Sequence, residues 1–317
     1  MQTRKKCWRR CMNKKNMLVL AILAMLVAIY FLGQRDKNTE ETFTYFSADS
    51  TSTYSVELAT SENRIVLSNV EGTWMLTEPV EAKVKSSKIE ALLDKLFAVK
   101  SSTLPVSESE ASFEKYNITD SLATSIKLFD QNKKLLDEAL IGEADNYNFS
   151  YGRDPKSNMI YQLSQNLAWA IKPELASWRE NVMLKLDSNN ITEFEVYSPE
   201  RSYKLTYSDS LWAYTEADVN VSVSDSSAKL KTVLKQFSNL KVNDFIDNDF
   251  ATYAEMFKTP LMAVKVNSSI KGEFTLNFIK YDGATDIMQI NNEEKTLYKV
   301  KSNLRENFST SLEDYLQ

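Results

Sequence analysis

The stretch that decides the fold is residues 74–99, WMLTEPVEAKVKSSKIEALLDKLFAV, because a close counterpart returns at residues 212–240 as WAYTEADVNVSVSDSSAKLKTVLKQFSNL. Each stretch begins with a tryptophan and a Thr-Glu pair, continues through alternating apolar residues, and ends with apolar residues at helical spacing. The correspondence extends further, since YQLSQNL at residues 161–167 matches YKVKSNL at residues 298–304. The chain is therefore interpreted as a tandem repeat.

Each copy predicts the same small fold. Period-two runs predict antiparallel strands with one face toward a core, and helical spacing predicts one helix with an apolar stripe. The stripe is formed by Ile89, Leu92, Leu93 and Leu96 in the first copy and by Leu230, Val233, Leu234 and Phe237 in the second. Ser87 with Glu90 three residues later has the pattern of a capping box at the helix start. In the second copy, Asp282–Gly283 predicts a two-residue hairpin turn.

The repeated tryptophans admit two interpretations. The favoured one is structural: each indole packs under the helix of its own repeat, and the matched residues act as anchors. These anchors are Trp74, Thr77 and Glu78 in the first copy and Trp212, Thr215 and Glu216 in the second. The alternative is stacking of the indoles on a sugar or peptide. Equivalent residues in both copies suit a shared core better than a single site.

The N-terminus has the pattern of a signal anchor. Seven Lys and Arg residues and no acid lie in the first fifteen residues, and residues 17–33, MLVLAILAMLVAIYFLG, contain no charge. Such a run predicts a transmembrane helix at the short end of bilayer-spanning lengths. No A-x-A-like site follows it, which disfavours a cleaved signal peptide, and a buried core helix would not explain the basic flank. The positive-inside bias places the N-terminus in the cytoplasm and the body outside it.

The sequence therefore predicts an α+β protein in which a transmembrane helix precedes two tandem repeats, each a mainly antiparallel meandering sheet with a helix packed on one face. The expected segments are a basic cytoplasmic tail (1–16), a transmembrane signal anchor (17–33), a polar tether (34–53), repeat 1 (54–172), a helical connector (173–191), repeat 2 (192–309) and a tail (310–317).

The composition narrows the possible chemistry. The chain has no histidine, which excludes Ser-His-Asp, Cys-His and His-zinc sites, and it has no P-loop or G-x-G-x-x-G motif. We expect no cofactor and no catalytic residue. Beyond the first fifteen residues, 31 basic residues stand against 43 acidic ones, which argues against nucleic-acid binding. The acids Asp244, Asp247 and Asp249 predict a solvated loop, and whether they bind a cation stays open.

Several short motifs resemble a bacterial family called domain of unknown function 4340. They are the stretch from Trp74 to Val99 and the segments FEKYNITD (113–120), ALIGEA (139–144) and WRENVMLKLD (178–187), within a resemblance covering roughly residues 60 to 240. The chain departs from the family at Asn117, where a Tyr-Gly-Leu-like turn has glycine. The resemblance implies a membrane-anchored envelope protein from a family often encoded beside a gliding-type ABC transporter auxiliary protein and its permease. It carries no catalytic residues onto this chain.

These observations predict a non-enzymatic accessory or scaffold protein. It would lie in the bacterial inner membrane with a single pass through residues 17–33, and it would bind an ABC-type permease, an auxiliary protein or another cell-envelope complex. One alternative is a binding module for an envelope glycan or peptide that uses the groove between the repeats. A carboxylate-based hydrolase is the other, although no particular pair of acids is indicated.

Overall fold

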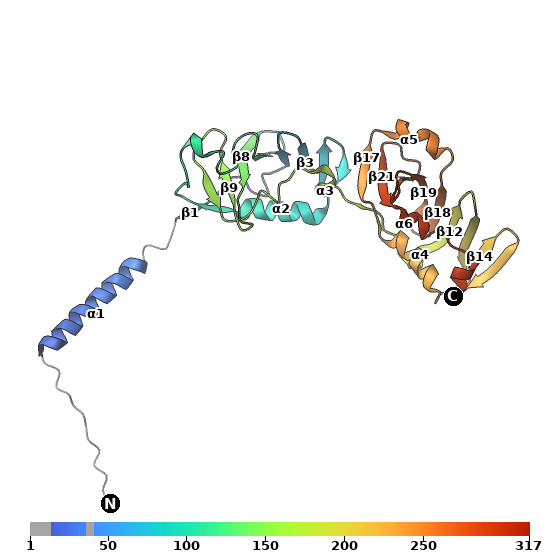
Figure 1. The fold of residues 1–317 in the computed structure, drawn as a ribbon, viewed down its shortest axis with the longest axis horizontal. Coiled ribbons are helices and arrows are strands. Elements are labelled where there is room, and N and C mark those ends of the chain that lie inside the picture. The colour runs from blue at the N-terminus through green and yellow to red at the C-terminus, as the bar shows by residue number, and fades with distance from the viewer. Residues whose placement is uncertain (1–13, 36–40) are drawn as a thin grey trace, which may run out of the picture.

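The computed structural model describes residues 14–35 and 41–317 (Figure 1). Most of the expected basic tail, residues 1–13, and residues 36–40 of the expected tether lie outside the described residues. The first described element is α1 (Lys14–Arg35), which coincides with the predicted anchor. It exposes eight large apolar side chains, each between 48% and 67% accessible: Leu18, Val19, Ile22, Leu23, Met25, Leu26, Val27 and Ile29.

The predicted transmembrane helix is not found in the described structure. Within residues 14–35 and 41–317, no helix combines the length and the apolar character needed to cross a membrane. The side chains of Met17, Leu20 and residues 30–33, which belong to the expected span, lie outside the description. The membrane span thus stays a prediction from sequence.

Repeat 1 is built on a ten-stranded antiparallel sheet in the order β1-β6-β10-β9-β8-β7-β2-β3-β4-β5. The strands are β1 (Thr42–Thr44), β2 (Ser55–Ala59), β3 (Arg64–Val70), β4 (Thr73–Glu78), β5 (Ala82–Lys83), β6 (Lys100–Ser102), β7 (Thr124–Phe129), β8 (Leu135–Glu143), β9 (Ser150–Arg153) and β10 (Tyr161–Leu163). The helices are α2 (Ser86–Ala98), η1 (Glu110–Ser112) and α3 (Leu175–Trp178).

Repeat 2 is built on a nine-stranded antiparallel sheet in the order β15-β14-β13-β12-β18-β19-β20-β21-β17, with a separate β11-β16 pair. The strands are β11 (Val182–Leu184), β12 (Ile191–Tyr197), β13 (Ser202–Ser208), β14 (Leu211–Glu216), β15 (Val219–Val223), β16 (Leu240–Lys241), β17 (Asp244–Asp247), β18 (Met262–Ser268), β19 (Gly272–Lys280), β20 (Thr285–Ile290) and β21 (Thr296–Lys301). The helices are η2 (Ser188–Asn190), α4 (Ala228–Ser238), α5 (Phe250–Phe257), α6 (Ser302–Glu306) and α7 (Leu312–Leu316).

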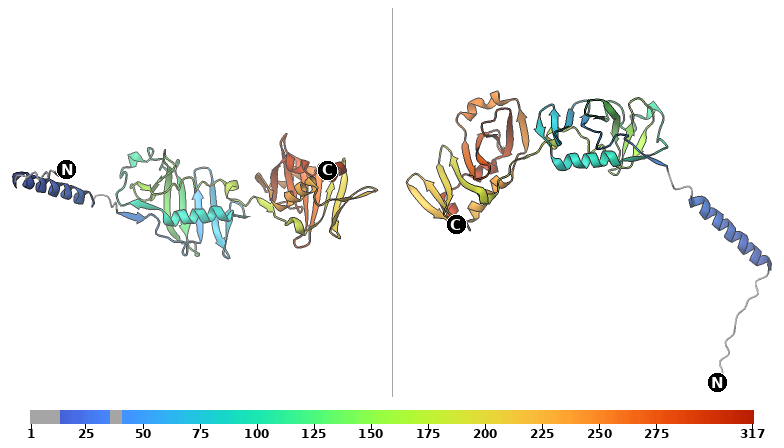
Figure 2. Two further views of the ribbon diagram at one scale, coloured as in Figure 1. Left: turned by 90° about the horizontal axis from the view of Figure 1, so that it is seen from below. Right: turned by 180° about the vertical axis from the view of Figure 1, so that it is seen from behind.

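The two sheets have the same strand order. The run β5-β4-β3-β2-β7-β8-β9-β10 of repeat 1 corresponds strand for strand to β15-β14-β13-β12-β18-β19-β20-β21 of repeat 2. In both sheets the first hairpins and the later strands meet at a central antiparallel pair, β2 with β7 and β12 with β18. Figure 2 shows the two sheets as separate bodies joined by one segment. The prediction of mainly antiparallel sheets with a few helices is confirmed.

Each sheet buries the apolar stripe of its helix, as the spacing predicts. In α2, Ile89, Leu92 and Leu96 are buried against the strand residues of repeat 1, whereas Leu93 is only partly buried. In α4, all four expected residues, Leu230, Val233, Leu234 and Phe237, are buried. The two cores are therefore separate apolar clusters, each closed by its own helix.

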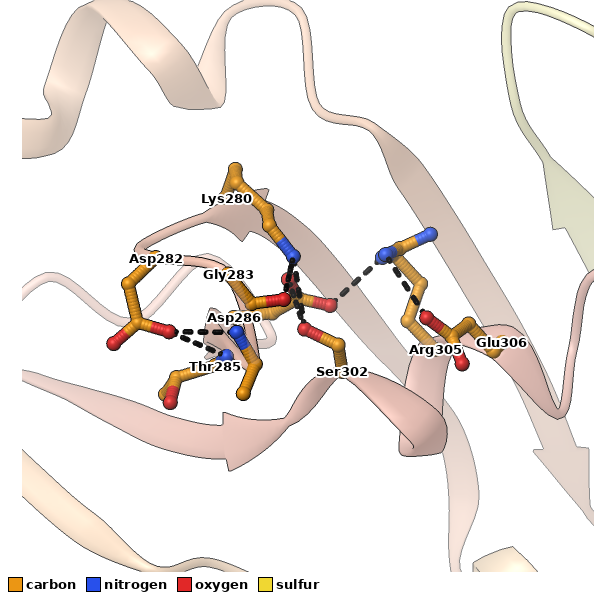
Figure 3. A network of polar contacts seen from close by, with 9 residues as sticks. Lys280, Asp282, Gly283, Thr285, Asp286, Ser302, Arg305 and Glu306 are labelled. Atoms are coloured by element: carbon orange, nitrogen blue, oxygen red, sulfur yellow. Dashed lines mark hydrogen bonds and ion pairs between the residues drawn. The ribbon is translucent and has the colours of Figure 1, made fainter.

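Two local predictions are wrong. α2 begins at Ser86, and its cap residue, Lys85, makes no side-chain capping bond, so Ser87 and Glu90 do not form a capping box. The turn at Asp282–Gly283 is longer than two residues, because β19 ends at Lys280 and β20 begins at Thr285. The Asp282 carboxylate accepts hydrogen bonds from the N–H groups of Ala284 and Thr285, each at 2.8 Å, and so closes a four-residue loop (Figure 3).

The expected tether, connector and tail are largely parts of the two folded repeats. β1 lies within the expected tether and pairs with β6, and Phe46 just after it is 3% exposed. Within the expected connector, β11 pairs with β16, and Leu186 is 2% exposed. The expected tail contains α7, whose Tyr315 is buried. Their apolar side chains lie among polar residues without a clear period, and the connector alone buries Trp178, Leu184, Leu186 and Ile191.

Candidate binding groove between the two repeats

One extended segment, the junction segment (residues 178–186), joins the two sheets. The Lys85 N–H donates to the Trp178 carbonyl at 2.9 Å, and the Glu180 N–H donates to the Lys83 carbonyl at 2.8 Å. These bonds flank an antiparallel bridge between Val84 and Arg179, so the segment covers the outer edge of β5. It then becomes β11, which pairs with β16 of repeat 2. The same segment therefore covers the edge strand of repeat 1 and pairs with a strand of repeat 2.

Trp178 fixes the start of the junction segment in repeat 1. Its indole is fully buried, and its Nε1–H donates to the Lys172 carbonyl at 2.8 Å. The ammonium of Lys88, on α2, lies 4.1 Å from the centroid of the indole ring and donates to the Ser177 hydroxyl at 2.6 Å. Burial, together with repulsion from Lys85, lowers the pKa of Lys88 to about 8.

Arg179 connects the junction segment to repeat 2. Its Nη1 lies 2.5 Å from an Asp247 carboxylate oxygen, and its guanidinium lies 3.8 Å from the centroid of the Phe245 ring. The second Asp247 oxygen accepts a hydrogen bond from the Thr296 hydroxyl at 2.9 Å. The Arg179 side chain is only 5% exposed, and its buried Nε has no hydrogen-bond partner among the described residues. A charged pair this well enclosed holds the segment against β17.

A groove of about 370 Å³ lies over this junction. Side chains of both signs and a few aromatic and apolar groups surround it: Glu81, Ala82 and Lys83 from repeat 1, Arg179, Glu180, Val182 and Met183 from the junction segment, and Phe245, Glu293, Lys295, Thr296 and Tyr298 from repeat 2. Lys295 and Glu81 form an ion pair across the groove at 3.8 Å. Burial raises the pKa of Tyr298, although the positive charge of Arg179 opposes that rise.

A second polar network lies inside repeat 2 (Figure 3). The Asp286 side chain is fully buried, and its two oxygens contact Lys280 Nζ at 3.3 Å, the Ser302 hydroxyl at 2.9 Å and Arg305 Nε at 2.7 Å. Ser302 and Lys280 are 3.0 Å apart, the spacing of a Ser-Lys catalytic pair. Both groups also contact the buried Asp286 carboxylate, and the network joins α6 to β20.

The family described as Domain of unknown function (DUF4340) matches residues 74–258. The chain belongs to this family. The DUF4340 match begins in β4 of repeat 1 and ends after α5 of repeat 2, so it includes the whole junction segment together with Arg179 and Asp247. No curated protein matches the chain.

Two motifs that resemble DUF4340 sequences contact each other in the structure. Asn117 adopts a φ of 53°, a left-handed conformation that favours glycine and that asparagine tolerates. Gly142 packs directly on this turn, since a Cβ at Gly142 would lie 2.3 Å from the Tyr116 carbonyl oxygen. The departure at Asn117 therefore keeps the backbone conformation that the turn requires.

The repeated anchors lie away from the groove. Trp212 is 4% exposed and Trp74 is partly buried, and each packs in the core of its own repeat. The Thr77 hydroxyl donates to the Val66 carbonyl at 3.3 Å.

The remaining anchors lie on the same two strands, β4 and β14. Glu78 pairs with Arg64 at the surface. Thr215 is partly buried and lies opposite Lys204 of β13. Glu216 accepts from the Tyr214 hydroxyl at 2.6 Å and pairs with Arg201 at 2.9 Å. Each of these contacts lies within a single repeat, and the anchor role of the six residues stays a prediction.

The three acids after α4 do not lie in one loop. Asp244 and Asp247 belong to β17, where Asp244 lies 3.7 Å from Lys299 and Asp247 binds Arg179. The Asp249 side chain accepts from the Thr252 hydroxyl at 2.5 Å at the start of α5. In the described part of the chain, no group of three or more His, Cys, Asp or Glu side chains is arranged to hold a metal ion.

Sequence reasoning missed Arg179 as a site residue. The available signal was its position next to Trp178 in WRENVML, a stretch with several apolar residues, where a charged side chain needs a partner once the segment is buried. The partner, Asp247, lies 68 residues away in the chain, and no local spacing connects the two.

Proposed function

We propose that this DUF4340 chain is a non-catalytic accessory protein of the bacterial cell envelope. In this proposal residues 17–33 hold it in the inner membrane with the N-terminus in the cytoplasm, and the two repeats bind an ABC-type permease, its auxiliary protein or a related membrane complex outside the cytoplasm.

The observation that carries the proposal is the exposed apolar surface of α1. Eight large apolar side chains along this helix are roughly half or more exposed, and the fully uncharged run continues through residue 33. Side chains of this kind are stable when they contact lipid or another apolar helix. Two sheets with separate cores follow α1, so the surfaces of both repeats could bind a partner.

Purification from membranes in mild detergent tests the proposal. The full chain is expected to sediment with membranes and to retain a membrane-protein partner, whereas a variant that begins at residue 41 should lose membrane association because it lacks α1. Purification of the full chain alone from repeated membrane preparations would contradict the scaffold role.

Orientation has a separate test. A reporter that is active only outside the cytoplasm, fused after residue 60, is expected to be active. The same fusion with Arg4, Lys5, Lys6, Arg9 and Arg10 changed to Glu should lose activity, because the positive-inside bias is reversed. Activity only from a cytoplasmic reporter at residue 60 would show that the orientation is the opposite one.

A second candidate function is binding of an envelope peptide or glycan in the groove between the repeats. The groove combines groups of both charges with the rings of Phe245 and Tyr298, and this mixed lining suits an aromatic ligand that also carries polar groups. Peptide and glycan arrays probed with the full chain in detergent should retain ligands that an Arg179→Met variant does not. Equal retention by both proteins would exclude Arg179 as a ligand-binding residue.

A further inference from the structure

The two repeats differ at one edge of their sheets. In repeat 1 the outer edge of β5 is covered by the junction segment, through the Lys85–Trp178 and Glu180–Lys83 backbone hydrogen bonds. In repeat 2 the corresponding strand is β15, which is the outermost strand of its sheet. None of the described residues pairs with its outer side.

The path of the chain before this edge is the same in both repeats. α3 follows β10, and α7 follows β21 after the short helix α6. The fourth residue of α3 and of α7 is a buried aromatic, Trp178 at 0% exposed and Tyr315 at 1%. The Tyr315 hydroxyl lies 3.1 Å from that of Tyr203. Tyr315 of repeat 2 is therefore the counterpart of Trp178, the residue at which the covering segment of repeat 1 begins. Among the described residues, no such segment covers the edge of repeat 2.

The backbone of β15 presents the same groups as that of β5. Ala213 pairs with Ser222 as Met75 pairs with Lys83, so Ser222 takes the place of Lys83, and Ser224 takes the place of Lys85. In repeat 1 these positions direct a C=O and an N–H to the covering segment. In repeat 2 the same two groups face outward from the edge.

The edge of β15 lacks the usual protection against strand addition. Its sequence, VNVSV, has no charge and no proline, and its register with β14 has no shift. Val219, at one end, is 45% exposed. Natural edge strands of this length normally carry a lysine, a proline or a bulge, unless another strand pairs with them.

We infer that the outer edge of β15 binds an extended peptide segment of a partner protein by antiparallel strand addition, in the place that Arg179–Glu180 takes on repeat 1. This inference rests on the proposed scaffold function, since it names the surface that receives a partner. The occupant is an extended segment with at least one basic residue, because exposed Asp218 and Asp225 lie at the two ends of the strand and Arg179 occupies the matching position on β5.

A labelled peptide of residues 178–186, WRENVMLKL, which includes the Trp178 carbonyl, serves as the probe. We expect saturable binding to the full chain in detergent, measured by fluorescence anisotropy. A Ser224→Pro variant should weaken binding at least tenfold, because proline removes the outward N–H that corresponds to that of Lys85 and leaves the inner pairing with β14 intact. Ser222→Ala should bind as the wild type does, and the proline variant should keep the wild-type circular dichroism.

The peptide itself supplies the second control. N-methylation of its glutamate amide, which corresponds to the Glu180 N–H that donates to Lys83, should abolish binding. A photoreactive side chain in place of Asn220 should cross-link the unmodified peptide and not the methylated one. Absence of saturable binding, or equal binding of the methylated peptide, would overturn the inference. Because the assay contains no membrane partner, its result is independent of the co-purification that tests the scaffold function.

Discussion

The enclosed ion pair of Arg179 and Asp247 is the main side-chain interaction at the junction. Removal of one member of such a pair leaves an uncompensated buried charge, which costs far more than the pair itself contributes. Its geometry also explains why sequence reasoning did not find it, because Arg179 lies in the junction segment and Asp247 lies in β17, and the two interact only once the segment packs on repeat 2.

Asp247→Ala is expected to lower the free energy of unfolding by about 3 kcal/mol, because the Arg179 guanidinium is left buried without its carboxylate. Urea unfolding followed by tryptophan fluorescence measures this change. The matched control is Lys258→Ala, which breaks the well-exposed Lys258–Glu255 pair and should change stability by less than about 1 kcal/mol. Equal effects of the two substitutions would show that the junction pair is not desolvated.

Gly142→Ala tests the contact between the two family motifs. Its Cβ would lie 2.3 Å from the Tyr116 carbonyl oxygen, so the backbone must move, at a cost of about 1–3 kcal/mol. Asn117→Gly is the control, because glycine adopts the positive φ freely and should change stability by no more than about 1 kcal/mol. Thermal unfolding of both variants decides the matter, and a neutral Gly142→Ala would refute the packing argument.

The Lys88 ammonium predicts a dependence of stability on pH. Its pKa falls from 10.5 to about 8 on folding, so between these values the folded chain binds fewer protons than the unfolded chain. Stability should therefore rise as the pH increases from about 8 to 10.5. Lys88→Met should remove this part of the rise, as measured by urea unfolding at several pH values. A slope that is unchanged in Lys88→Met would assign the effect to another group.

At the scale of the element, the helices α2 and α4 show what periodicity can predict. Of the eight positions that apolar spacing assigned to the two stripes, seven are buried, because a helix that covers a sheet must bury one face. It did not identify the start of α2, since the helix begins at Ser86 and its cap residue, Lys85, makes no side-chain capping bond. The short strands β1, β11 and β17 were missed because three or four residues carry too little pattern to distinguish a strand from a loop.

Leu96→Ala in α2 and Phe237→Ala in α4 are expected to destabilise their own repeats by about 2–5 and 3–5 kcal/mol, because both side chains are fully buried in separate cores. Leu93→Ala, at a partly buried position, should cost less. Hydrogen exchange read by mass spectrometry should locate the faster exchange in the mutated repeat. Equal acceleration in both repeats would show that the two cores unfold as one unit.

At the scale of the whole molecule, the strongest prediction from sequence was duplication, and the strand order of the two sheets agrees with it. Matching residues across two copies revealed the architecture because both copies retain the same core positions. The groove and its charged pair could not be predicted in the same way, since they exist once and depend on how two repeats meet. The function of the whole molecule must therefore be tested with the intact chain.

The junction segment also has a mechanical consequence. Because residues 178–186 are bonded along β5 and then along β16, a pull applied along this segment loads several hydrogen bonds at once instead of opening them one after another. The Arg179 side chain adds a lateral brace to β17. A pull that separates the two repeats along this segment must therefore break these hydrogen bonds together with the Arg179–Asp247 pair.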